Sequence, residues 1–284
     1  MKVLATRPLP GPAWNELGDV ELGSGGDAEV LIVCNEPVDL SHHPALRLIA
    51  NYGVGYDRID LDACLAAGVA VTNTPGVLDA ATADLAFALM LAARRGVVSG
   101  DRLVRSGAWG AHWADAPALG REVSGATLGI VGLGRIGSAV AGRALGFDMT
   151  VLHVRRSEGD LDEVLHASDV VSLHVPLTPE TKGLITRERL ALLQDGATLV
   201  NTARGAVVDE DALVDELVSG RINAGLDVFA HEPDVPAALL ELPNVVLTPH
   251  VASATVETRA AMTRIVVDNV LAFARGEPLP NRVV

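Results

Sequence analysis

The chain has 284 residues, 49% hydrophobic and 20% charged, a balance typical of a folded protein of two domains rather than a disordered chain. Its net charge of −14 opposes contact with nucleic acid and anionic membranes, so neither is an expected partner. No apolar run approaches the roughly 20 residues of a membrane span and no signal peptide is evident, so we expect a cytoplasmic protein. The two cysteines lack metal-site spacing, and we predict no metal.

Short apolar runs alternate with helix-like segments in the first part of the chain. The runs are rich in Val, Ile and Leu and predict buried parallel strands at 3–6, 30–35, 46–51 and 69–73. Between the last two runs, 61–67 predicts a short helix. The segment 79–95 predicts a long helix that bridges two lobes. We therefore expect a first lobe of the α/β class.

A second series of six apolar runs follows and predicts a doubly wound parallel sheet. These strands are expected at 127–131, 150–154, 170–175, 197–202, 224–228 and 245–248. Apolar residues three and four apart predict crossover helices at 136–145, 161–167, 187–193 and 210–218. A last helix is expected at 255–275 and would return the chain to the first lobe.

A glycine pattern follows the first strand of this second series. The sequence there is Gly132-Leu133-Gly134-Arg135-Ile136-Gly137, at the start of an expected helix. The first glycine allows a tight turn, the second lets a pyrophosphate approach the backbone, and the third lets the helix pack on the strand. Because the pattern lies between strand and helix, it favours a dinucleotide site over a turn that binds nothing.

The end of the next strand carries Arg155, Arg156 and Ser157, where proteins that bind NAD usually have an acidic residue. Guanidinium groups pair well with a 2′-phosphate, whereas a carboxylate would repel it. We therefore predict that NADP(H) is preferred over NAD(H). The alternative is that these are solvated surface arginines.

Three polar residues follow strands of the second series, at the edge where open α/β sheets bind ligands. Arg204 could clamp the carboxylate of a 2-oxo acid, His250 could supply the proton for reduction, and Glu232 could hold the imidazole in its charged form. Taken singly, Arg204 and Glu232 could instead be solvated loop residues. His231 is a weaker rival for the role of acid.

Glycines also follow a strand of the first lobe, in the segment 51–57. Here Val54 and Gly55 could present consecutive backbone N–H groups to the substrate carboxylate. A plain tight turn is an equally good interpretation of this segment.

Together these segments resemble the D-isomer-specific 2-hydroxyacid dehydrogenase family. The similar stretches are 51–61, 71–95, 125–147, 169–184, 199–205, 225–233 and 244–259. The resemblance implies two Rossmann-like domains, one a doubly wound parallel-sheet cofactor domain and the other a smaller, flavodoxin-like substrate domain. The substrate domain would be discontinuous, with residues 1–94 plus 257–284, and the dinucleotide domain would span 95–256. A homodimer formed largely through the cofactor domain is also implied.

The same resemblance assigns roles to individual residues. Arg204 would bind substrate, His250 would be the acid/base and Glu232 its support, while Asp227 would contact the nicotinamide carboxamide and Pro176 the adenine. Further cofactor contacts would come from Val175, Thr181, Thr202, Ala203 and Ala252. The segment between Arg156 and Asp169 is shorter than the family pattern, which has an additional strand and helix there.

The chain is most similar to the glyoxylate, hydroxypyruvate and 2-ketogluconate reductases of that family. We expect reduction of a small 2-oxo acid to the D-2-hydroxy acid. The alternatives are an activity of the D-3-phosphoglycerate dehydrogenase type, or a non-catalytic protein that senses dinucleotides, as corepressors of this fold do.

Overall fold

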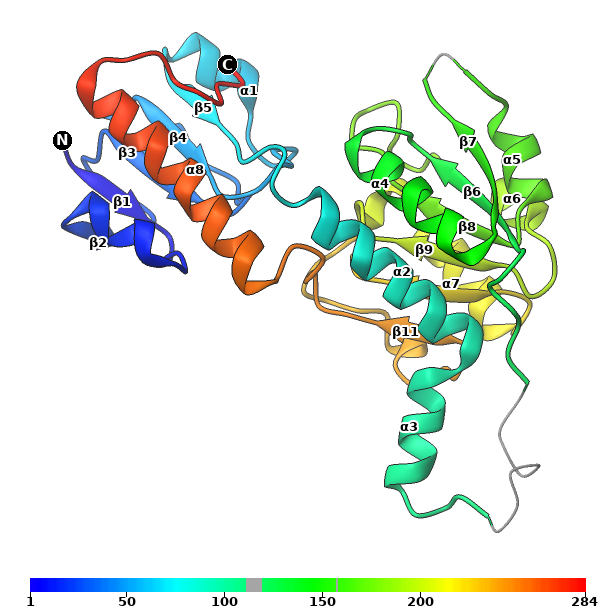
Figure 1. Ribbon diagram of the computed structural model, residues 1–284. Coiled ribbons are helices and arrows are strands. Elements are labelled where there is room, and N and C mark those ends of the chain that lie inside the picture. The colour runs from blue at the N-terminus through cyan, green and yellow to red at the C-terminus, as the bar shows by residue number, and fades with distance from the viewer. Residues whose placement is uncertain (111–118, 157) are drawn as a thin grey trace. The chain divides into compact units, whose positions relative to one another are not determined.

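The computed structural model describes residues 1–110, 119–156 and 158–284 (Figure 1). They form two compact units, Met1–Leu78 with Ser253–Val284 and, between them in sequence, Asp79–Ala252. The sequence predicts domain boundaries at 94/95 and 256/257, whereas the structure places them at 78/79 and 252/253. Helix α2 (Asp79–Arg95) lies in the second unit because Phe87 and Leu89 are buried in a core cluster with Val140 of that unit. It therefore does not bridge two lobes as an independent element.

The first unit is built on a five-stranded parallel sheet in the order β2-β1-β3-β4-β5, the flavodoxin-like arrangement. Its strands are β1 (Val3–Ala5), β2 (Val20–Leu22), β3 (Val30–Val33), β4 (Leu48–Asn51) and β5 (Ala70–Thr72). The helices are α1 (Leu61–Ala66) and α8 (Val256–Arg275), with 3₁₀ turns at Pro12–Leu17 and Leu40–His42. Four of these strands confirm the prediction, whereas the edge strand β2 was not expected.

The second unit contains a six-stranded parallel sheet in the order β11-β10-β9-β8-β6-β7. Its strands are β6 (Thr127–Val131), β7 (Thr150–Val154), β8 (Val170–Leu173), β9 (Thr198–Asn201), β10 (Asn223–Leu226) and β11 (Val245–Leu247). Besides α2, its helices are α3 (Val97–Arg105), α4 (Arg135–Ala144), α5 (Leu161–Ala167), α6 (Arg187–Leu192) and α7 (Glu210–Val218). Short 3₁₀ turns occur at Leu145–Phe147, Gly205–Val207 and Ala237–Leu239. All six predicted strands are confirmed.

Helices cover both faces of this second sheet, which explains why its strands are continuous apolar runs. Ile130 belongs to a core cluster with residues of α2 and α4, whereas its neighbour Val131 belongs to a cluster with residues of α5, α6 and α7. Successive residues of a strand point to opposite faces, so one buried strand needs apolar residues at every position.

Strand β7 is the edge of the second sheet. Beyond it, the amide of Arg155 donates to the carbonyl of Glu158 at 2.8 Å, and α5 begins at Leu161. Arg155 and Glu158 thus pair through their backbones, and Gly159 and Asp160 connect this pair to α5. Within the described ranges, no helix is both long and apolar enough to cross a bilayer.

Candidate active site

The glycine turn at the end of β6 is built by close packing. Gly132 has a positive φ of 97°, and a Cβ atom there would lie 2.7 Å from the carbonyl oxygen of His174. A Cβ atom on Gly137 would overlap the carbonyl oxygen of Gly132. Both positions therefore require glycine, because the turn, β8 and the first turn of α4 touch through their backbones.

Gly134 is different, because the space beside it is open. It is the N-cap of α4, and no side chain caps the helix there. Apart from its chain neighbours and the backbone of α4, no described residue has a heavy atom within 4 Å of the position of a Cβ atom. The end of β9 also presents a buried polar atom, since the hydroxyl of Thr202 has no hydrogen-bond partner among the described residues. An exposed helix N-terminus and an unsatisfied hydroxyl fit the pyrophosphate and ribose of a dinucleotide.

The predicted 2′-phosphate site lies in the turn after β7. Both Arg155 and Arg156 are exposed there, and the Nη2 atom of Arg156 is 3.7 Å from the Glu180 carboxylate. Ser157 lies outside the described residues. On the loop after β8, the hydroxyl of Thr181 donates to the carbonyl of Pro176 at 2.6 Å and so fixes the conformation of that loop.

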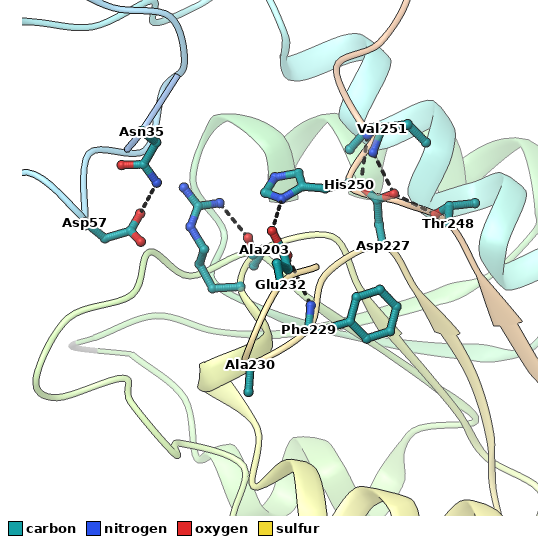
Figure 2. A network of polar contacts seen from close by, with 12 residues as sticks. Asn35, Asp57, Ala203, Asp227, Phe229, Ala230, Glu232, Thr248, His250 and Val251 are labelled. Carbon is teal, nitrogen blue, oxygen red and sulfur yellow. Dashed lines mark hydrogen bonds and ion pairs between the residues drawn. The ribbon is translucent and has the colours of Figure 1, made fainter. Parts of the chain in front are cut away.

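A histidine and a carboxylate meet after strands β10 and β11. Nδ1 of His250 donates to Oε2 of Glu232 at 2.8 Å, and Oε1 of the same carboxylate accepts from the amide of Phe229 at 3.1 Å (Figure 2). Burial raises the pKa of Glu232, but the hydrogen bond and charge of His250, the amide of Phe229 and the charge of Arg204 together outweigh it, so the net pKa is below its usual value. Glu232 therefore stays ionised and holds the Nδ1 atom of His250.

The backbone of His250 is held in the left-handed region, with φ of 52°. Its amide donates to the carbonyl of Asp227 at 2.9 Å. The carboxylate of Asp227 accepts from the hydroxyl of Thr248 at 2.6 Å and from the amides of Val251 and Ala252, each at 2.9 Å. Burial raises the pKa of Asp227 despite these hydrogen bonds. The hydrogen bonds of Asp227 therefore fix the loop both before and after His250 (Figure 2).

Arg204 follows β9 in a turn that packs directly beside the Glu232 loop. The side chain of Asn201 forms this turn by accepting from the amide of Ala203 and donating to the carbonyl of Arg204. A Cβ atom on Gly205 would overlap the backbone of Phe229, so the two loops touch. The guanidinium charge also contributes to the lowered pKa of Glu232. Arg204, Glu232 and His250 are therefore brought together.

Val54 and Gly55 lie in the first unit, in the loop after β4. No described residue accepts a hydrogen bond from the amide of either. Both amides therefore meet the requirement of an anion-binding turn, whose N–H groups have no acceptor within the protein. The side chains that hold these two loops could not be identified from sequence. They are Asn51 and Asn73 at the loop after β4, which donate to its carbonyl groups, and Thr248 beside His250. An asparagine that ends a buried strand just before two glycines was the available signal for Asn51.

The second unit thus has an open glycine turn at the start of a helix, with an imidazole, a carboxylate and a guanidinium gathered on neighbouring loops. These features define a dinucleotide-dependent oxidoreductase. Comparison with known proteins identifies the family. A model of the D-isomer specific 2-hydroxyacid dehydrogenase NAD-binding domain matches residues 87–252, more than half of the chain.

Relatives and solved structures agree with this match. The glyoxylate reductase of Korarchaeum cryptofilum is 49% identical over 275 residues, which cover 90% of this chain and 83% of that protein. The crystal structure of the TT0316 protein from Thermus thermophilus is 44% identical, covers 100% of both chains and has a TM-score of 0.93. An NADPH-dependent glyoxylate/hydroxypyruvate reductase from Sinorhizobium meliloti, in complex with NADP and malonate, is 34% identical, covers 100% of this chain and 96% of that chain, and has a TM-score of 0.88.

The chain belongs to the D-isomer-specific 2-hydroxyacid dehydrogenase family. It is an oxidoreductase that reduces 2-oxo acids to D-2-hydroxy acids with a nicotinamide dinucleotide as cofactor.

Proposed function

We propose that the substrate is a small 2-oxo acid of the glyoxylate or hydroxypyruvate type, reduced to the D-2-hydroxy acid. The observation that carries this proposal is the 2.8 Å contact between His250 and Glu232, in a loop cluster that also contains Arg204. Relatives that reduce glyoxylate support the choice of substrate.

The roles of the residues follow from their contacts. The bound dinucleotide supplies the hydride. Nε2 of His250 supplies the proton, because Nδ1 is already held by Glu232. Arg204 has the planar pair of donors that can bind the substrate carboxylate while polarising the carbonyl oxygen. Glu232 is a positioning residue that also stabilises the protonated imidazole.

We assign a separate binding role to each unit. We propose that the first unit holds substrate through the amides of Val54 and Gly55, and that the second holds the dinucleotide. The glycine turn and the helix start would bind the pyrophosphate. The remaining expected cofactor contacts are Arg135, Ile136, Val175, Pro176, Thr181, Thr202, Ala203, Asp227 and Ala252.

We further propose that NADPH is preferred over NADH. Arg155 and Arg156 are exposed in the turn after β7, and in a Rossmann fold this position lies beside the adenosine ribose and its 2′-phosphate. The guanidinium group of Arg156 lies 3.7 Å from the exposed carboxylate of Glu180, an ion pair weak enough to be exchanged for a phosphate. The solved reductase from Sinorhizobium meliloti contains NADP.

A homodimer formed through the second unit is also proposed, with α3 as part of the contact. In Figure 1, α3 extends away from the sheet of this unit. None of its residues is buried, and Val97 and Val104, seven residues apart on one side of the helix, are 56% and 59% exposed. Apolar side chains on a projecting helix favour association. A cytoplasmic location remains a prediction.

A substrate panel tests the proposed function. Wild-type protein is assayed with glyoxylate, hydroxypyruvate, pyruvate and 3-phosphohydroxypyruvate, each with NADPH and with NADH, by the loss of reduced cofactor absorbance. We expect the highest kcat/KM for glyoxylate or hydroxypyruvate with NADPH. Preference for the phosphorylated acid, or cofactor binding without turnover of any acid, would contradict the proposal.

A further inference from the structure

We propose that Asn51 is a positioning residue that orients the amide groups of the loop after β4 toward the substrate carboxylate. The inference rests on the proposed function, because it assigns a task to the loop that would bind that carboxylate. Asn51 is the last residue of β4 and is fully buried. A polar side chain at such a position needs hydrogen-bond partners within the protein, and those of Asn51 all belong to the backbone.

The carboxamide of Asn51 draws two carbonyl groups of the loop toward itself. Its Nδ2 atom donates to the carbonyl of Gly55 at 2.7 Å and to that of Gly53 at 3.2 Å. Its Oδ1 atom accepts from the amide of Asn35 at 2.7 Å. Both N–H donors and the oxygen of one buried side chain are thus occupied, so its orientation is fixed.

The third carbonyl of the loop is held by a second asparagine. Nδ2 of Asn73 donates to the carbonyl of Val54 at 2.9 Å, and the amide of Thr74 donates to the carbonyl of Gly53 at 3.0 Å. Every carbonyl from Gly53 to Gly55 therefore has a donor. In contrast, no described residue accepts from the amides of Val54, Gly55 or Tyr56.

The planarity of the peptide bond connects these two observations. In a trans peptide, the C=O of one residue and the N–H of the next point in opposite directions. Fixing the carbonyls of Gly53 and Gly55 on Asn51 consequently turns the amides of Val54 and Tyr56 away from that side chain. Asn73 does the same for the amide of Gly55 through the carbonyl of Val54. Three N–H groups are thus left for an anion.

The neutral charge of Asn51 matters as much as its shape. An aspartate in this place would have nearly the same volume and could still accept from Asn35. It would, however, set an anionic oxygen against the carbonyl of Gly55 and place a negative charge behind the amides that receive the substrate. The pair Asn51→Ala and Asn51→Asp therefore separates loss of the donors from addition of charge.

The test is steady-state kinetics with glyoxylate and NADPH, together with the Kd of NADPH by fluorescence. The matched control is Asn269→Ala, since Asn269 is also fully buried in the first unit. Its carboxamide makes three hydrogen bonds, one to the carbonyl of Ile265 and two with Asn281. Loss of one hydrogen bond to an anion weakens binding by about tenfold or more. We expect Asn51→Ala to raise KM at least that much and Asn51→Asp to raise it further, with smaller changes in kcat and an unchanged Kd for NADPH.

The control should lower thermal stability but leave KM near the wild-type value. If KM in both Asn51 variants stays within twofold of wild type, or rises equally in Asn269→Ala, the inference is wrong. If the Asn51 variants do not fold, Asn73→Ala decides, with a raised KM expected and an unchanged KM refuting the mechanism. The proposed function is tested separately by wild-type protein, and it fails if that protein prefers the phosphorylated acid or reduces no 2-oxo acid.

Discussion

Glu232→Gln removes a charge from the active site with almost no change in shape. The wild-type carboxylate lies 2.8 Å from Nδ1 of His250, and a hydrogen bond between two ionised groups contributes about 1.5–3 kcal/mol. The side chains of His250 and Glu232 are 46% and 29% exposed, so solvent screening places the value nearer about 1–2 kcal/mol. We therefore expect kcat at neutral pH to fall by about five- to thirtyfold.

The pH dependence of kcat gives the sharper test of this variant. Only the protonated imidazole can give up a proton, and the variant lacks the carboxylate that stabilises that form. The advantage of wild type over this variant in kcat, measured at saturating NADPH and glyoxylate, should shrink as acidification protonates Glu232. An unchanged profile together with an unchanged kcat would refute the role of Glu232, whereas the Kd of NADPH should be the same in both proteins.

Stability should follow the lowered pKa of Glu232. A carboxyl group whose pKa is lowered in the folded state stabilises the fold above its unfolded pKa, and this contribution is lost as pH falls through the lowered value. Wild-type protein should thus lose part of its advantage over Glu232→Gln on acidification below the ordinary range of a carboxyl group. Thermal unfolding of the two proteins at several acidic pH values measures this loss, and parallel curves would contradict it.

Other substitutions test the remaining parts of the account. Gly134→Ala should fold normally, since its site is open, but raise the Kd of NADPH at least about tenfold, whereas Gly137→Ala should lower the free energy of unfolding by about 1–3 kcal/mol. Replacing Arg155 and Arg156 together with Ala should raise KM for NADPH but not for NADH; equal effects would exclude selective phosphate binding. Val104→Asp should shift the sedimenting species from dimer toward monomer, and an unchanged dimer would contradict the proposed contact through α3.

Burial on both faces made the second sheet easy to predict. Val170 and Val171 are both fully buried, on opposite faces of β8, and such runs are read directly from sequence. Strand β2 (Val20–Leu22) escaped prediction because it lies at an edge and is mostly exposed, so it has no apolar run. Helix α3 was missed for the same reason, since it buries no residue.

The domain boundaries show a different limit. The pattern 79–95 predicts a helix correctly, but periodicity does not say which sheet a helix covers. Phe87 and Leu89 are as apolar as any residue that packs on the first sheet. Their assignment to the second unit depends on contacts with residues about 50 positions further along the chain, such as Val140.

The candidate catalytic residues could be proposed from sequence because each has a reactive side chain in the loop that follows a strand. His250 and Arg204 are examples, and the carboxyl ends of parallel strands gather such side chains at one edge. The supporting residues were not predictable in this way. Asn51 contacts carbonyl groups that any sequence would provide, so its role depends on the course of the backbone rather than on side-chain chemistry.

The central claim is that His250 supplies the proton in the reduction of a 2-oxo acid. Its most direct test is the rate of NADPH oxidation by His250→Ala with saturating glyoxylate, beside the Kd of NADPH for the same variant. Loss of a positioned general acid should lower kcat by about 100-fold or more while NADPH binds as in wild type. A variant that reduces glyoxylate at the wild-type rate would contradict the account.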